Sequence, residues 1–355
     1  MSEMIEDFSE SYHEAVERYV AAVSNRGWTT HVVSHAAHDH FLTHFSYLGS
    51  ASPHRLLLLT SGIHGVEGFL GSAIQLSLIE RLLDRFDTTT EHAVLLVHAI
   101  NPFGFERIRR VNEDNIDLNR NFLFGEQTFQ GAHAHYRTLD PFLNPKQWPR
   151  HEPPMQVQAA WQIFKHGLPT LQQAIAEGQY EFPYGLFFGG HEYSSTVKIL
   201  NEHLLPKLRL ADDVLHFDLH TGLGQFATFK LLLDHDLKEN EANTMTSLFG
   251  NQISLPQEGV GYQARGGFNH WIRHHIPHAC SFCFEVGTYS PLKILSALRA
   301  ENAAYHWGDR DSPKFKEVKR RLKEMFCPQS PTWRQAVLKQ AHDLLRHVLE
   351  NWLLK

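Results

Sequence analysis

The fold is decided by one short stretch, RLLLLTSGIHGVEG at residues 55–68. Its first half, 55–60, is an apolar run that ends in Ser61-Gly62, and such a run predicts a fully buried strand. Beyond the stretch, apolar residues over 69–83 recur with the 3.6-residue period of a helix, and 93–100 is a second apolar run. Strand, helix and strand in this order predict an α/β fold with a largely parallel sheet.

The rest of the chain continues this alternation of strands and amphipathic helices. Further strands are predicted at 214–219, 226–233 and 281–286, and helices at 10–25 and in the last forty residues. No repeat or linker interrupts the sequence, so we expect a single domain over residues 1–355. The stretch at about 124–190 is rich in aromatic residues and is expected to be an elaboration packed on the core, with C-terminal helices after about 295.

Composition and charge narrow the classes of partner. The 355 residues carry 33 basic and 39 acidic side chains, a net charge of −6 with neutral histidines, and no basic block, so nucleic acid is not an expected partner. The longest apolar runs fall far short of the roughly 20 residues that cross a membrane. The acidic N-terminus lacks the features of a secretory signal, and three cysteines do not suggest a disulfide framework. We expect a cytoplasmic protein with no membrane partner.

A pair of residues with metal-ligand spacing follows the first predicted strand. His64 and Glu67 form an H-x-x-E pair, which on a helical turn puts both side chains within reach of one cation. A second pair, His347 and Glu350, lies in the predicted C-terminal helix, where a solvated face is the simpler interpretation. The first pair is surrounded by three glycines within 62–68, which let the chain turn tightly at the carboxyl end of the strand. We therefore expect a metal site at the first pair.

A catalytic zinc site needs a third protein ligand and an open position. His220 is the best candidate, because it ends the predicted strand at 214–219 and is followed by the glycine turn TGLG. His216 and Asp218 share its face of the strand, since side chains alternate with a period of two. Only His220 lies at the edge where a site opens, and His216 is interpreted as a packed histidine.

Five motifs, in order from His64 to Glu285, resemble the signature of the zinc metallocarboxypeptidases, typified by carboxypeptidase A. Among them are one segment, with NPFGF at 101–105 followed by RVN at 110–112 and IDLNRNF at 116–122, and then GYQARGG at 261–267 and Phe284-Glu285. The segments SGIHGVEGFLGSAIQ, GQYEFPYGLFFGG and DLHTGLG are closer still to a bacterial branch of that superfamily whose function is unknown. The resemblance covers roughly residues 8–295 and implies a mixed, largely parallel sheet flanked by helices.

The resemblance implies a metal centre and the groups that act beside it. It makes His64, Glu67 and His220 the ligands of one zinc ion per chain. Glu285 would be the general base that deprotonates a zinc-activated water. Arg110 would stabilise the tetrahedral oxyanion. An unpaired carboxylate on an apolar strand, as Glu285 would be, is difficult to explain without such a role.

The resemblance also implies residues that bind the substrate. Asn119 and Arg120 match the pair that holds a terminal carboxylate, a task suited to the planar guanidinium. Asp117 matches the carboxylate that orients the first histidine ligand. Tyr262 matches a mobile tyrosine that closes over substrate. Asn269 falls where the family sets side-chain specificity, and it is neither apolar nor charged.

Several assignments stay open. Arg107 and Arg109 are alternatives to Arg110 for the oxyanion, and the whole cluster could be a solvated basic face. Cys280 and Cys283 form a C-x-x-C, but on a strand these positions face opposite sides, so both are interpreted as packing residues.

These observations together predict a zinc hydrolase that cleaves an amide next to a free carboxylate in small peptides. One alternative is an N-acyl-amino-acid deacylase resembling the succinylglutamate and aspartate deacylases, which would take an acylated amino acid. Another is a catalytically silent metal-binding protein. The carboxylate of Glu285 argues against the last, because a structural zinc needs no base.

Overall fold

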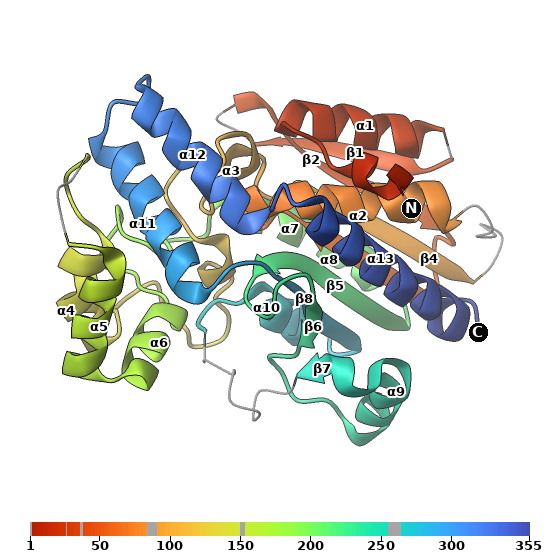
Figure 1. Cartoon of the computed structure of the whole chain (residues 1–355). Coiled ribbons are helices and arrows are strands. Elements are labelled where there is room, and N and C mark those ends of the chain that lie inside the picture. The colour runs from red at the N-terminus through yellow and green to blue at the C-terminus, as the bar shows by residue number, and fades with distance from the viewer. Residues whose placement is uncertain (1, 26, 36–37, 84–90, 150–152, 255–263) are drawn as a thin grey trace.

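An eight-stranded sheet forms the centre of the computed structural model of this chain (Figure 1). The structure describes residues 2–25, 27–35, 38–83, 91–149, 153–254 and 264–355. The strands are β1 (Thr29–His35), β2 (His38–Gly49), β3 (Arg55–Ser61), β4 (His92–His98), β5 (Asp213–Gly222), β6 (Phe229–Leu232), β7 (Ile253–Ser254) and β8 (Ala279–Gly287). Their order across the sheet is β1-β2-β4-β3-β5-β8-β6-β7.

The four central strands run parallel. β3 pairs with β4 on one side and β5 on the other, and β5 pairs with β8, all in parallel orientation. β2 and β6 flank this core as antiparallel neighbours. The predicted mixed, largely parallel sheet is therefore confirmed. Because the carboxyl ends of parallel strands meet at one edge, the ends of β3, β5 and β8 lie together.

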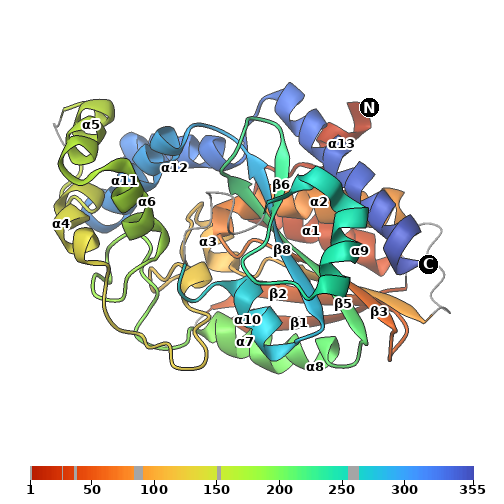
Figure 2. The same ribbon diagram turned by 90° about the horizontal axis from the view of Figure 1, so that it is seen from below.

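Helices cover both faces of the sheet and extend beyond one end of it. They are α1 (Tyr12–Ser24), α2 (Gly68–Arg81), α3 (Pro102–Glu106), α4 (Ala134–Leu143), α5 (Met155–His166), α6 (Leu168–Ala176), α7 (Ser195–His203), α8 (Leu205–Leu208), α9 (Glu239–Phe249), α10 (Phe268–His275), α11 (Pro291–Trp307), α12 (Pro313–Phe326) and α13 (Pro331–Val348). Figure 2 shows α2 and α13 on one side of the sheet and α7, α8 and α10 on the other, with α4, α5 and α6 far to one end. Within the described residues, no helix is both long and apolar enough to cross a membrane.

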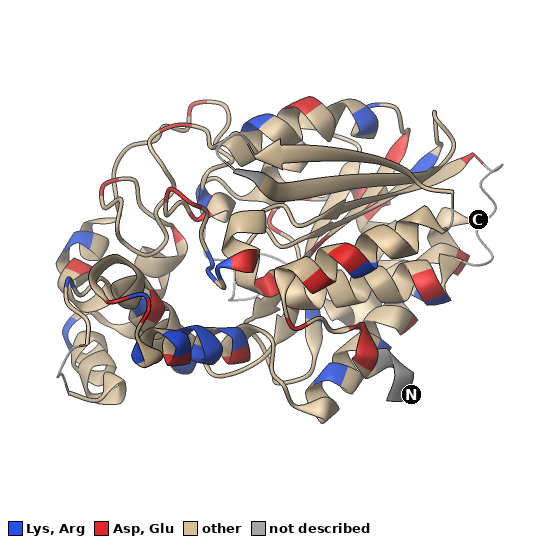
Figure 3. Cartoon of the chain, turned by 90° about the horizontal axis from the view of Figure 1, so that it is seen from above, with Lys and Arg blue, Asp and Glu red and all other residues tan. Residues whose placement is uncertain are grey.

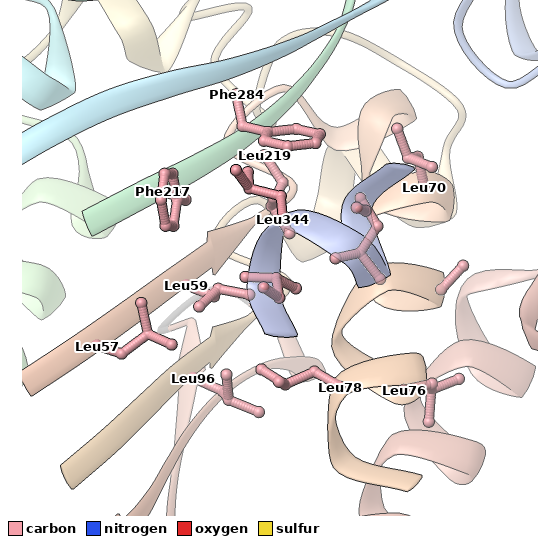
Figure 4. Close-up of a cluster of buried hydrophobic side chains, with 14 of the residues drawn as sticks. Leu57, Leu59, Leu70, Leu76, Leu78, Leu96, Phe217, Leu219, Phe284 and Leu344 are labelled. Carbon is pink, nitrogen blue, oxygen red and sulfur yellow. The ribbon is translucent and has the colours of Figure 1, made fainter. Parts of the chain in front are cut away.

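Alternate residues of the central strands supply two separate cores, because successive side chains of a strand face opposite sides. Leu57 and Leu59 of β3 point toward α2 and α13, where Leu344 of α13 packs near them (Figure 4). Leu56 and Leu58 point to the opposite face and pack with α8 and α10. All four leucines are fully buried, which explains why this strand is apolar without alternation.

Charged residues lie mainly on helices and loops. Figure 3 shows the strands almost entirely tan, while α12 mixes basic and acidic residues along its length. Against this pattern, Asp218 on β5 and Glu285 on β8 stand out, because they are 0% and 8% exposed. Buried carboxylates in a sheet need partners that compensate their charge.

Most predicted elements are present, but some differ from the prediction. The strand predicted at 226–233 is only the short β6. The closing amphipathic helix predicted in the last forty residues is α13, and most of α12 precedes it in the same stretch. Pro328 lies between these two helices and Pro331 begins the second, as expected for a residue that cannot continue a helix. β1 and β2 were not predicted, because histidine, serine and threonine interrupt their apolar pattern.

Residues 124–190 contain α4, α5 and α6 and pack beside α11. Tyr136 of α4 and Leu171 of α6 lie in one buried cluster with Leu298 of α11. Val66, from the turn after β3, belongs to the same cluster. The described residues of the segment thus share one buried cluster with the turn that carries the predicted metal ligands.

Candidate metal centre

His64 and Glu67 lie on the tight turn between β3 and α2. Residue 65 must be glycine, because a Cβ on it would lie 2.0 Å from the carbonyl carbon of Gly104. The Val66 amide donates a hydrogen bond of 2.8 Å to the carbonyl oxygen of Arg109. The turn is therefore fixed from outside by the backbone of the segment that follows β4.

The side chains of His64, Glu67 and His220 converge. One ligand atom from each lies within 4.8 Å of the others. The Nδ1 atom of His64 is 2.9 Å from Glu67 Oε1, and that of His220 is 2.9 Å from Glu67 Oε2. All three residues are buried. The structure thus brings the predicted ligands together from a turn and from the end of β5.

Each histidine is supported by a second carboxylate. The Nε2 atom of His64 lies 3.1 Å from Asp117 Oδ1, and that of His220 lies 2.6 Å from Asp218 Oδ2. Burial alone would raise the pKa of Asp117, but Arg110 and His64 lower it well below its usual value. An ionised carboxylate only accepts, so each Nε2 directs a hydrogen at its carboxylate, and a bound metal ion would be coordinated through each Nδ1, on the side of Glu67.

The charges around these atoms fit a divalent cation. Four buried carboxylates surround the site with two guanidinium groups: Glu67, Asp117, Asp218 and Glu285, with Arg110 and Arg120. Among the described residues the buried carboxylates outnumber the guanidinium groups, as a cation site requires, and two imidazoles with one carboxylate form a known set of catalytic zinc ligands. Without an ion, burial would lower the pKa of His220, but Asp218 and Glu67 raise it well above its usual value.

Arg110 lies directly beside the predicted ligands. Its Nε donates to Asp117 Oδ2 at 2.9 Å, and its Nη1 is 3.5 Å from Glu67 Oε1. Its guanidinium is thus held at the edge of the centre by two carboxylates, with its side chain 15% exposed.

The two neighbouring arginines lie elsewhere. Arg109 is fully buried, donates to Glu301 of α11 at 3.0 Å and stacks on the ring of Tyr305. The side chain of Arg107 is 55% exposed, and its Nη2 lies 3.8 Å from Glu106 Oε1. Of the three arginines that the sequence left open, only Arg110 contacts the residues of the metal centre.

Asn119 and Arg120 form a turn between Asp117 and the elaboration. Asn119 Oδ1 accepts a 2.8 Å hydrogen bond from the amide of Phe268, which ties the turn to the start of α10. Arg120 is 8% exposed, and its Nε has no hydrogen-bond partner among the described residues. A buried guanidinium with an unused N–H group can pair with an anion.

For the other two predicted substrate-binding residues, Asn269 and Tyr262, the structure shows fewer contacts. Asn269 lies on α10, 7% exposed, and its Oδ1 has no hydrogen-bond partner within the described part of the chain. Tyr262 lies outside the described residues. Its predicted role as a mobile cover therefore stays a prediction.

Glu285 lies at the end of β8, next to His220. Its Oε1 accepts a 2.7 Å hydrogen bond from the Leu223 amide, and its Oε2 is 3.6 Å from Cys283 Sγ. Burial, together with the negative charge of Glu67, raises the pKa of Glu285. A carboxyl group with a raised pKa is suited to accept and return a proton near neutral pH.

Two residues of this site were not recognised from the sequence. Cys283 was interpreted as a packing residue, yet a ligand atom of it lies within 4.8 Å of those of His220 and Glu285. Cys280, by contrast, is buried in the core, so the two cysteines do face opposite sides of β8. Asp218 was placed on the face of His220 without a role. The period of two along each strand was the available signal for both.

The fold is a carboxypeptidase-like α/β fold. Thrombin-activatable fibrinolysis inhibitor superposes with a TM-score of 0.53 and 12% sequence identity, over 97% of this chain and 74% of that one. Carboxypeptidase A from Helicoverpa armigera gives a TM-score of 0.48 at 12% identity, over 89% of this chain and 74% of the other. A metallo-carboxypeptidase from Pseudomonas aeruginosa gives 0.44 at 14%, over 92% and 68%.

Within this fold the sequence has its own family. The chain belongs to the family described as "Protein of unknown function (DUF2817)", which it matches over residues 8–340. Among curated proteins, no sequence matches it.

Proposed function

We propose that this chain is a zinc-dependent hydrolase that cleaves an amide bond next to a free carboxylate in small peptide substrates. The observation that supports this most is the convergence of the ligand atoms of His64, Glu67 and His220. Glu285 adds a carboxylate of raised pKa beside the same histidine. A purely structural metal site would need no such group.

The proposed chemistry divides between the metal and the side chains. Zinc held by His64, Glu67 and His220 would polarise the scissile carbonyl and acidify the attacking water. Glu285 would accept the proton of that water on Oε2, because its Oε1 is occupied by the Leu223 amide, and would then pass the proton to the leaving amine. Arg110 would donate to the oxyanion from the edge of the centre.

The free carboxylate of the substrate would pair with Arg120. Its buried Nε–H group has no hydrogen-bond partner in the described chain, while its Nη1 donates to the carbonyl oxygen of Asn119. Arg110 is already paired with Asp117 and Glu67, so it is less suited to hold a substrate carboxylate. Asn119 holds the turn that presents Arg120.

The first experiment measures the metal. We expect elemental analysis of the purified protein to give one zinc per chain, lost in His220→Ala. His347→Ala is the matched control, because it belongs to the other H-x-x-E pair, on the exposed face of α13. Equal zinc loss in both variants, or full occupancy in His220→Ala, would remove His220 from the centre.

The second experiment identifies the bond. Dipeptides with a free C-terminus should be cleaved faster than the same dipeptides amidated, since an unpaired Arg120 would remain. Equal cleavage of both forms would contradict the carboxypeptidase assignment. A preference for short acyl groups on a single amino acid would favour the N-acyl-amino-acid deacylase instead.

A further inference from the structure

A continuous chain of hydrogen bonds leads from β8 to the metal ligand on β5. Ser281 Oγ lies 2.7 Å from His216 Nδ1, and His216 Nε2 lies 2.8 Å from Thr60 Oγ1. Thr60 Oγ1 is 2.6 Å from Asp218 Oδ1, while Asp218 Oδ2 is 2.6 Å from His220 Nε2. Every member except His220 is 0% exposed, and His220 is 3% exposed. The chain crosses the three strands β8, β5 and β3.

The direction of each bond follows from the chemistry of the groups. The Asp218 carboxylate only accepts, so the single hydroxyl hydrogen of Thr60 points to it. Thr60 must then accept from His216 Nε2, which leaves His216 Nδ1 to accept from the Ser281 hydroxyl. Burial lowers the pKa of His216 to about 4, so its ring is neutral and has one hydrogen, as this order requires. One tautomer of His216 satisfies every bond.

We infer that Asp218 is a positioning residue of the metal centre, held by Thr60 and His216 so that its second oxygen fixes the ring of His220. This inference rests on the proposed function, because it gives Asp218 its role through the metal ligand. With Asp117 behind His64, both histidines would then have a carboxylate partner. Such partners fix the ring orientation of a metal-binding histidine and raise its basicity.

A purely structural role for Thr60, His216 and Asp218 would not explain the hydrogen bond between Asp218 and His220. Burying a carboxylate is costly, and well-packed apolar side chains would stabilise a sheet interior at least as well. One oxygen of Asp218 nevertheless accepts a hydrogen bond from Thr60, and the other accepts one from the proposed metal ligand His220. A preorganised metal ligand requires such an arrangement: Asp218 holds the ring of His220, and Thr60 and His216 hold Asp218.

The test measures metal affinity and not only catalysis. The zinc dissociation constant of the wild-type chain, Asp218→Asn and Thr60→Val is measured at one fixed pH by competition with a chromophoric chelator. We expect Asp218→Asn to weaken zinc binding by about 10- to 100-fold, and Thr60→Val to weaken it less. The visible absorption spectrum of the Co²⁺-substituted protein should change in Asp218→Asn, because the orientation and basicity of His220 change.

Thr43→Val is the matched control for Thr60→Val. The buried Thr43 hydroxyl likewise contacts a histidine Nε2, that of His35 at 2.9 Å, and donates to the carbonyl oxygen of Ala99 at 2.8 Å. Both valine variants should lose stability, but only Thr60→Val should lose zinc affinity. If Asp218→Asn fails to fold, the comparison of the two valine variants still decides the matter.

The possible outcomes separate this inference from the proposed function. Wild-type zinc uptake with unchanged affinity and unchanged Co²⁺ spectrum in Asp218→Asn would overturn the inference alone. Equal zinc affinity in Thr60→Val and Thr43→Val would also overturn it, because no support would then pass through Thr60. A wild-type chain that takes up no zinc would overturn the proposed function and the inference together.

Discussion

His220 and Glu285 are register partners at the carboxyl ends of the neighbouring parallel strands β5 and β8. Their side chains emerge on the same face of the sheet, and their separation is set by the pairing of two central strands. A metal ligand and a general base placed in this way are held by the most rigid part of the fold. The turn after β3 then adds the remaining proposed ligands, His64 and Glu67.

The first prediction concerns Glu285→Gln. If Glu285 is the base and not a ligand, the variant should keep its zinc while kcat falls by about 10²- to 10⁴-fold, the usual contribution of general acid-base catalysis. Zinc content and kcat are measured on the same preparation. Loss of zinc in Glu285→Gln would instead show that Glu285 binds the metal together with His220.

The three proposed metal ligands could be recognised from the sequence immediately around them. His64, Glu67 and His220 each follow an apolar strand and lie in or before a glycine turn, so the strand ends could be located without the structure. Their convergence then followed from the parallel order of the strands. The role of Asp218 could not be found in this way, because its link to Thr60 depends on the pairing of β3 with β5.

Which of the three neighbouring arginines lies at the metal centre could not be predicted from the sequence. Arg107, Arg109 and Arg110 are close neighbours in the sequence, with nothing local to distinguish them. What separates them is a partner far away in the sequence: Arg109 pairs with Glu301, which lies on α11, 192 residues further along the chain. Only the packing of α11 on the loop reveals which guanidinium remains at the metal centre.

A second prediction follows from these different surroundings. Arg109→Met should lower the free energy of unfolding by about 3–5 kcal/mol, because it leaves the buried Glu301 without one of its charged partners. Arg110→Met should also lower stability, because it leaves the buried Asp117 without a charged partner, but in addition the folded variant should lose about 10²-fold or more in kcat, as for a lost oxyanion donor. Arg107→Ala, on the exposed side, is the control for both measurements. A catalytic loss in Arg107→Ala equal to that in Arg110→Met would contradict the assignment.

The third prediction concerns Arg120 and the carboxylate of the substrate. Arg120→Gln should raise KM for a free-carboxylate dipeptide about 10- to 100-fold, the scale of a lost charge-assisted hydrogen bond. The amidated dipeptide should be affected little, because it lacks the charge that Arg120 pairs with. The two changes should therefore not be additive in a double cycle.

Arg265→Gln is a suitable control for this cycle. Arg265 stacks on the ring of Tyr180 and donates to the backbone carbonyl of Thr128, so its guanidinium is already engaged. Its loss should change the two substrates by the same factor. Additive effects of Arg120→Gln and amidation would show that Arg120 does not hold the carboxylate.

The fourth prediction is a loss of stability at acidic pH. His44 and His98 are register partners on β2 and β4, both buried, and burial lowers the pKa of His44 to about 4 and that of His98 well below its usual value. The unfolded chain binds these protons near pH 6.5 and the folded chain does not. The free energy of unfolding should therefore fall as the pH drops from about 6.5 toward 4, by about 2 kcal/mol for His44 alone at pH 5.

Denaturant unfolding at pH 7.5 and pH 5 measures this loss. His44→Gln removes one titrating group, so the difference between the two pH values should shrink in that variant. His54→Gln is the control, because His54 is exposed at the start of β3. An equal pH dependence in the wild-type chain and His44→Gln would exclude His44 as a source of the loss.

The last prediction is a limit on substrate size. The elaboration at 124–190 packs directly on the turn proposed to bind the carboxylate: Tyr180 OH donates to the carbonyl oxygen of Arg120 at 2.7 Å, and a Cβ on Gly178 would lie 2.6 Å from Arg120 Cδ. The Asp117 amide also donates to Phe188 O at 2.7 Å. A segment in this position should wall the site and admit only short substrates. The competing arrangement, in which the mass packs only on the flank formed by α11, would leave long substrates unaffected.

A series of substrates that share one C-terminal residue tests this limit, from a dipeptide through a decapeptide to an intact protein with a flexible tail. We expect kcat/KM to fall steeply beyond a few residues, because the wall excludes the chain that precedes the scissile bond. The amidated member of each pair is the control for cleavage that does not depend on the C-terminus. Comparable kcat/KM for the dipeptide and the protein tail would place the elaboration away from the substrate path, even though it contacts Arg120.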